Sequence, residues 1–106
     1  MNLENEIITL SNNLRFRSQI SLQDIIAHIK FIVDYLKRDT KEISIFVLDD
    51  LLSKYKKVLG KEEFETLYGG VFIIKVFLYL NYNFGNVDGF IEDCLKEYLK
   101  ERASLN

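Results

Sequence analysis

The side chains most often used for catalysis and metal binding are scarce in this chain. Its 106 residues include one histidine, His28, and one cysteine, Cys94. A structural zinc site takes four ligands, mostly Cys and His, and a nucleophilic Cys–His pair needs a third group to orient it. Two residues cannot complete a four-ligand zinc site, and the sequence offers no third group to orient a Cys–His pair. We therefore predict no metal site and no cofactor.

Carboxylates could still support metal-dependent hydrolysis. Helical pyrophosphohydrolases place acidic residues three and four positions apart on facing helices, where they hold metal ions. Here no such pair recurs on two predicted helices, and the phosphate-binding pattern GxxxxGK[ST] is absent. The acidic clusters are predicted to be solvated helix faces, and the chain is predicted not to be an enzyme. These clusters are Asp49-Asp50, Glu62-Glu63-Glu65 and Glu92-Asp93.

Basic residues suggest nucleic-acid binding as an alternative. The formal net charge is −2, from fourteen basic and sixteen acidic residues, so no broad cationic surface is expected. A recognition helix usually begins with polar and basic residues, whereas residues 22–28 are mainly acidic and apolar. Nucleic acid is therefore an unlikely partner. The residues that would contact it are Arg15, Arg17, Lys54, Lys56, Lys57 and Lys61.

A protein partner fits a second pattern better. Beside the apolar face of a predicted helix over residues 22–38, four further residues recur at i, i+4, i+7 and i+11. Aromatic side chains are favoured at the centres of protein interfaces. The predicted partner-binding residues are Asp24, His28, Phe31 and Tyr35, with Glu92, Asp93 and Glu97 as an acidic alternative.

Helical periodicity and the absence of proline predict a chain made mostly of helices. Ser21 is expected to cap the helix over 22–38, and Asp39 or Thr40 the next one. The buried face of that next helix is predicted to begin at Phe46 or Val47. The five predicted helices cover approximately residues 3–14, 22–38, 41–59, 61–82 and 87–99.

The fourth of these helices contains the most apolar stretch, "GGVFIIKVFLYLNYNF" over residues 69–84. A membrane span needs about 20 apolar residues, whereas the run from Val71 to Leu80, before Asn81, has only ten residues and includes Lys75. We therefore expect a central helix enclosed by its neighbours, and no membrane span. The alternative is that part of its surface meets another chain, as in a homodimer. Gly69-Gly70 is expected to kink or split the helix.

These observations predict an all-α fold, with residues 1–106 as one domain, an antiparallel bundle of about five helices around residues 71–80. The predicted function is non-enzymatic protein binding. By analogy of size and class, it would be that of an immunity or antitoxin protein that inhibits a larger, nuclease-like toxin. The alternatives are a nucleic-acid-binding regulator and a homo-oligomeric structural subunit. One cysteine and an N-terminus unlike a secretory signal favour the cytoplasm. The analogy with immunity and antitoxin proteins would imply a bacterial or phage source.

Overall fold

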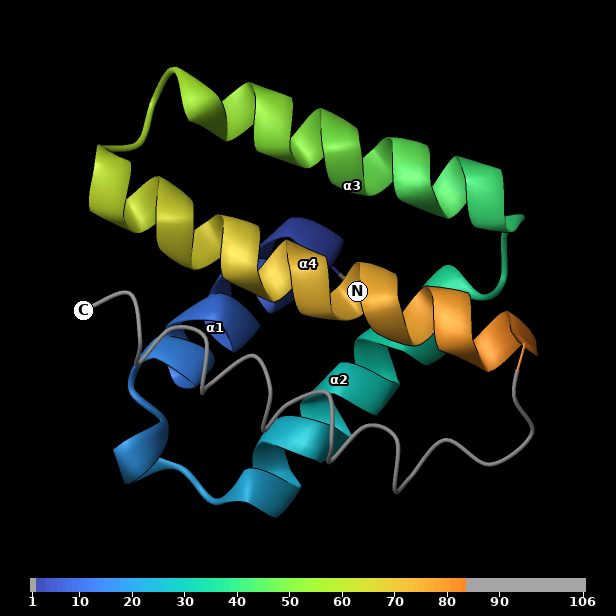
Figure 1. Cartoon of the computed structure of the whole chain (residues 1–106), viewed down its shortest axis with the longest axis horizontal. Helices are drawn as coiled ribbons and strands as arrows, with labels where there is room; N and C mark the ends of the chain where they lie inside the picture. Colours follow the sequence, from blue (N-terminus) through green and yellow to red (C-terminus); the bar gives the residue numbers. More distant parts are fainter. Residues whose placement is uncertain (1, 84–106) are drawn as a thin grey trace.

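The computed structural model describes residues 2–83, without the side chains of Arg17 and residues 80–83. This part of the chain consists of helices joined by short turns and has no strand, which confirms the all-α class (Figure 1). It contains four α-helices rather than about five, and the predicted fifth, over 87–99, lies outside the described residues. The elements are α1 (Leu3–Arg15), the 3₁₀ turn η1 (Arg17–Gln19), α2 (Leu22–Leu36), α3 (Lys41–Lys56) and α4 (Lys61–Asn83).

Side-chain caps fix where the first three α-helices begin. The Ser21 hydroxyl accepts a hydrogen bond from the Asp24 amide at 3.1 Å, as predicted. Thr40, one of two predicted candidates, caps α3 by accepting from the Ile43 amide at 3.3 Å. The ends of α2 and α3 come two or three residues earlier than the periodicity predicts. Val58, which falls within the helix predicted over residues 41–59, therefore lies beyond α3 and is 73% exposed.

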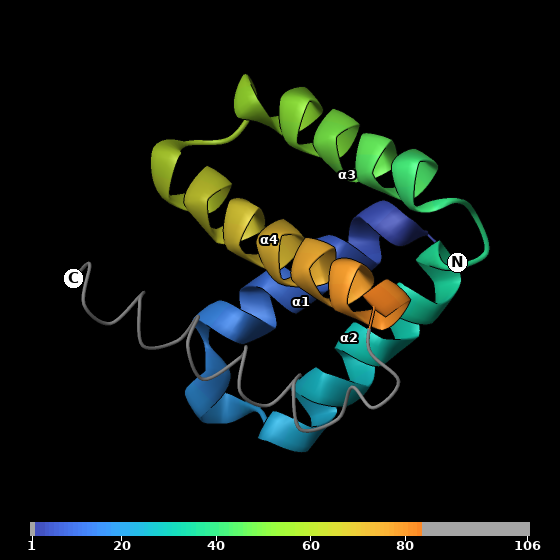
Figure 2. The ribbon, with the colours of Figure 1, turned by 45° about the vertical axis from the view of Figure 1, so that its right-hand side comes forward.

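α4 is the central helix, as predicted. It packs against each of the other three helices, and α1 also packs against α2. α3 and α4 lie side by side and run in opposite directions, whereas α2 crosses α4 obliquely (Figures 1 and 2). None of the described helices is long and apolar enough to cross a membrane. The α4 residues in the core are each at most 3% exposed, and they are Leu67, Val71, Ile73, Ile74, Phe77 and Leu78.

The two glycines neither split α4 nor end it, because the helix continues from Lys61 to Asn83. Gly70 instead allows α1 to come close. A Cβ atom at residue 70 would overlap the Ser11 hydroxyl and would lie 2.9 Å from Ser11 Cβ and 3.2 Å from Ser11 Cα. Ser11 is buried, and its hydroxyl donates to the Ile7 carbonyl at 2.8 Å. Gly70 and Ser11 thus mark a point where α1 and α4 approach each other closely.

Candidate binding surfaces

The predicted partner-binding residues of α2 do share one side of that helix, but only part of the set is available. Phe31 is 54% exposed, and Asp24 is exposed beside it. His28 is half-buried, with Nε2 2.6 Å from the Glu6 Oε2 of α1. Tyr35 packs against the core, and Arg38 lies over its ring. The acidic alternative, Glu92, Asp93 and Glu97, lies outside the described residues.

Two of the six basic residues proposed for nucleic-acid contact form ion pairs between helices. Arg15 of α1 pairs with Glu62 of α4, and Lys54 of α3 pairs with Glu4 of α1. Three others, Lys56, Lys57 and Lys61, are exposed. The side chain of Arg17 is not among those that the structure describes. Nucleic-acid binding stays a prediction, with fewer unpaired cations to support it.

α3 carries an exposed apolar cluster that was not predicted from the sequence. Phe46 is 70% exposed, Ile43 50% and Val47 38%, whereas one of Phe46 and Val47 was predicted to begin the buried face. Ser44 is buried there instead, and its hydroxyl donates to the Leu36 carbonyl of α2 at 2.7 Å. Because Ser44, Leu48 and Leu51 face the core, Ile43, Phe46 and Val47 lie on another side of the helix and point outward.

A groove of about 490 Å³ lies between this cluster and the start of α1. Val47 belongs to both the cluster and the groove. The groove is lined by the apolar side chains of Leu3, Val47 and Leu51 and by charged side chains of both signs. The full lining is Asn2, Leu3, Glu4, Val47, Asp50, Leu51 and Lys54. We call Ile43, Phe46, Val47 and this groove the α3 face.

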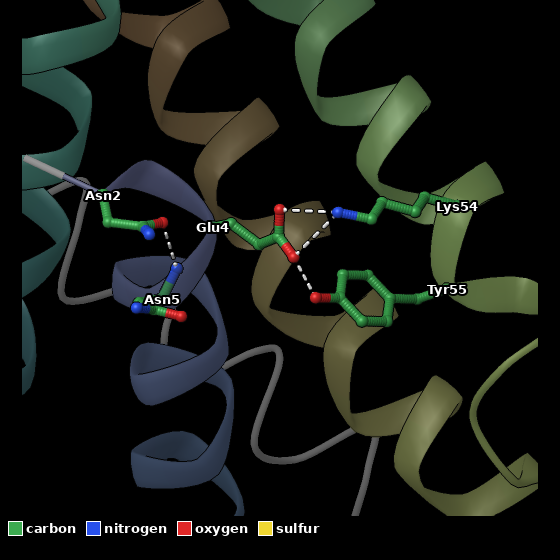
Figure 3. A network of polar contacts seen from close by, with 5 residues as sticks. All are labelled: Asn2, Glu4, Asn5, Lys54 and Tyr55. Atoms are coloured by element: carbon green, nitrogen blue, oxygen red, sulfur yellow. Dashed lines mark hydrogen bonds and ion pairs between the residues drawn. The ribbon is translucent and has the colours of Figure 1, made fainter.

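Glu4, which lines the groove, contacts two side chains of α3 (Figure 3). Its carboxylate accepts hydrogen bonds from the Tyr55 hydroxyl and from Lys54 Nζ, the latter at 3.1 and 3.2 Å. The Tyr55 hydrogen bond, followed by that from Lys54, lowers the pKa of Glu4 below its ordinary 4.5. The same bond raises the pKa of Tyr55, since the neutral hydroxyl is the donor. These contacts join the first turn of α1 to the last turn of α3.

The lowered pKa of Glu4 predicts an acid-dependent contribution to stability. A carboxyl with a lowered folded-state pKa stabilises the fold above its unfolded pKa and loses that effect as pH falls through the folded pKa. Glu4→Gln is therefore expected to be less stable than the wild type at neutral pH, and the difference should shrink below pH 4.5, the ordinary pKa of Glu4. Urea unfolding over this range measures the difference, with the exposed Asp34→Asn on α2 as control. A difference independent of pH would show that Glu4 is not held as a carboxylate.

α4 also has an exposed side, so the other described helices enclose it on several sides but not on all. Tyr68, Phe72 and Tyr79 are 55%, 46% and 56% exposed and lie in one line along the helix. Lys75 lies between them and pairs with Asp49 of α3. We call the line of Tyr68, Phe72, Lys75 and Tyr79 the α4 stripe.

Across residues 2–83, no three His, Cys, Asp or Glu side chains are grouped so that they could hold a metal ion. Comparison of the chain with protein-family models, curated proteins and solved structures found no match. Function is therefore inferred from the exposed surfaces. Of these, the α3 face combines Phe46, the most exposed of the large aromatic side chains described, with a concave neighbour.

Proposed function

We propose that this chain is a non-enzymatic protein-binding module and that its α3 face receives a heterologous protein. The observation that carries the proposal is the exposure of Ile43, Phe46 and Val47 within one helical turn beside a groove. Protein interfaces have an apolar, aromatic-rich centre and a polar rim. The cluster supplies such a centre, and Asp50 and Lys54 supply charged groups at the edge of the groove.

Clustering distinguishes these residues from ordinary exposed apolar side chains. Single exposed apolar residues are common on protein surfaces and need no explanation. Residues at i, i+3 and i+4 of one helix can enter a partner's surface together, which is how helical anchor sets bind. A buried aromatic residue at the centre of such a set commonly contributes most of the binding free energy. We assign this role to Phe46.

The inhibitor class is the narrower part of this proposal. Immunity and antitoxin proteins are small binding proteins, and a slightly acidic chain with net charge −2 suits a basic toxin such as a nuclease. Within the groove, Glu4 is already paired with Lys54, so Asp50 is the carboxylate placed to meet a cation on the partner. The expected partner therefore presents an apolar patch with a basic residue beside it.

Capture from a lysate of the source cell tests the proposal when two matched variants are compared with the wild type. Phe46→Asp changes the α3 face, and Phe31→Asp makes the same substitution on α2, where the residue is 54% exposed. We expect wild type and Phe31→Asp to retain the same protein after nuclease treatment and a salt wash. Loss of a central anchor of about 2 kcal/mol should reduce retention by Phe46→Asp roughly thirtyfold.

Two other outcomes would overturn the assignment. If Phe31→Asp lost the protein and Phe46→Asp kept it, the binding surface would be the predicted α2 stripe. If nuclease removed the captured material, the nucleic-acid alternative would replace the proposal. Both variants should keep the far-UV circular dichroism of the wild type, because both side chains are mostly exposed.

A further inference from the structure

The α4 stripe has the spacing of a helix-pairing seam. Together with Glu65, one turn earlier, the residues of the stripe are separated by three, four, three and four positions. This is the heptad spacing that keeps side chains of one helix facing a partner helix. Over fourteen residues at 1.5 Å each, the line is about 21 Å long. The residues in order are Glu65, Tyr68, Phe72, Lys75 and Tyr79.

We propose that this stripe pairs with the same stripe of a second copy of the chain. The two α4 helices would run antiparallel about a two-fold axis that passes between Phe72 and Lys75. Tyr68 would then face Tyr79 of the second copy, and Phe72 would face Lys75 of the second copy. Tyrosine rings can pack on one another, and a lysine ammonium is attracted to a phenylalanine ring. A parallel pairing would place each residue opposite the same residue of the second copy, so the Tyr79 end of one helix would lie about 21 Å from Glu65 of the other.

Charge complementarity supports the same arrangement. Lys41, at the start of α3, places Nζ 3.9 Å from the ring centroid of Tyr79. Since Tyr79 would face Tyr68 of the second copy, Lys41 would come next to Glu65 of that copy, one turn from Tyr68. The two-fold axis produces this contact twice. Asp49 pairs with Lys75 and so offsets its charge within each copy.

The pairing is independent of the proposed heterologous partner. Lys41 and Asp49 are the α3 residues that reach the exposed side of α4. Val47 instead lines the groove toward α1. The α3 face therefore points away from the seam, and a chain that pairs through α4 can still present Phe46. Phe72→Glu, which should abolish pairing, should leave capture of a heterologous protein unchanged.

Sedimentation velocity of the full chain over a range of concentrations tests the pairing. We expect the wild type to shift from monomer to dimer as concentration rises, and Phe72→Glu to remain monomeric with unchanged circular dichroism. Phe72 is 46% exposed, so the fold should accept the substitution. A wild type that stays monomeric, or a dimer that persists in Phe72→Glu, would overturn the proposal.

Charge reversal gives a test that does not depend on Phe72. Lys41→Glu and Glu65→Lys should each weaken the dimer about tenfold, because each places two like-charged pairs across the two-fold axis. An equimolar mixture of the two variants should recover the wild-type affinity within about threefold, because both pairs are opposite in charge in the mixed dimer. A mixture no tighter than either variant alone would overturn the antiparallel pairing.

Discussion

Replacing Phe77 with alanine is expected to lower the free energy of unfolding by about 3–5 kcal/mol. Phe77 is 0% exposed and lies on the central helix α4. The substitution removes buried apolar surface and leaves a cavity that the surrounding side chains of three helices can only partly fill. Since domains of this size have free energies of unfolding of about 5–15 kcal/mol, much of the stability would be lost.

Phe46→Ala is the matched control, since the substitution is the same and Phe46 is 70% exposed on α3. Exposed substitutions of this kind usually change stability by less than about 0.5 kcal/mol. Urea unfolding followed by circular dichroism measures both variants under one condition. Equal destabilisation by the two substitutions would mean that Phe46 is buried, and the α3 face would not exist as a free surface.

Gly70→Ala is expected to lower the free energy of unfolding by about 1–3 kcal/mol, as added volume does in a close-packed interior. In an unconstrained helix the same change stabilises by about 0.5–1 kcal/mol, so the sign itself is informative. The new Cβ would be 2.9 Å from Ser11 Cβ and 3.2 Å from Ser11 Cα. Rotation of the Ser11 hydroxyl cannot relieve those two contacts, so α1 and α4 would have to separate. Thermal unfolding should show a lower melting temperature.

A double-mutant cycle with Ser11→Gly identifies this crossing as the cause. Removing the Ser11 side chain removes the two atoms nearest to the added Cβ and leaves the Ser11 Cα atom at 3.2 Å. Gly70→Ala should therefore destabilise the Ser11→Gly background less than the wild type, by about 1 kcal/mol of coupling. Additive effects, or an increase in stability from Gly70→Ala alone, would contradict the close approach of the two helices.

The features of the fold that depend on local sequence could be predicted. Ser21 caps α2 because its hydroxyl reaches an amide only three residues away. α4 is central because its apolar residues exceed what one neighbouring helix can cover. The orientation of α3 could not be derived in this way, because Ser44 is polar and yet buried against the Leu36 carbonyl. A small side chain allows two helices to approach closely. The small residue Ser44 within the apolar run Ile43–Val47 was the signal in the sequence that this side of α3 could face a neighbouring helix.

The candidate site depends on contacts that the sequence does not reveal. Glu4 and Lys54 are 50 residues apart, and Arg15 and Glu62 are 47 apart. Their pairing follows from how whole helices pack, so no local pattern separates Lys54 from the exposed Lys56 and Lys57. The same holds for His28, whose contact with Glu6 removes it from the surface predicted to bind a partner.

The affinity of the captured partner for two variants tests most directly whether the α3 face is the partner-binding surface. Calorimetric titration of the purified partner into wild type, Phe46→Asp and Phe31→Asp would give three dissociation constants. We predict that Phe46→Asp binds about thirtyfold more weakly than the wild type, while Phe31→Asp binds equally well. Equal binding by the wild type and a folded Phe46→Asp would contradict the assignment of the α3 face as the partner-binding surface.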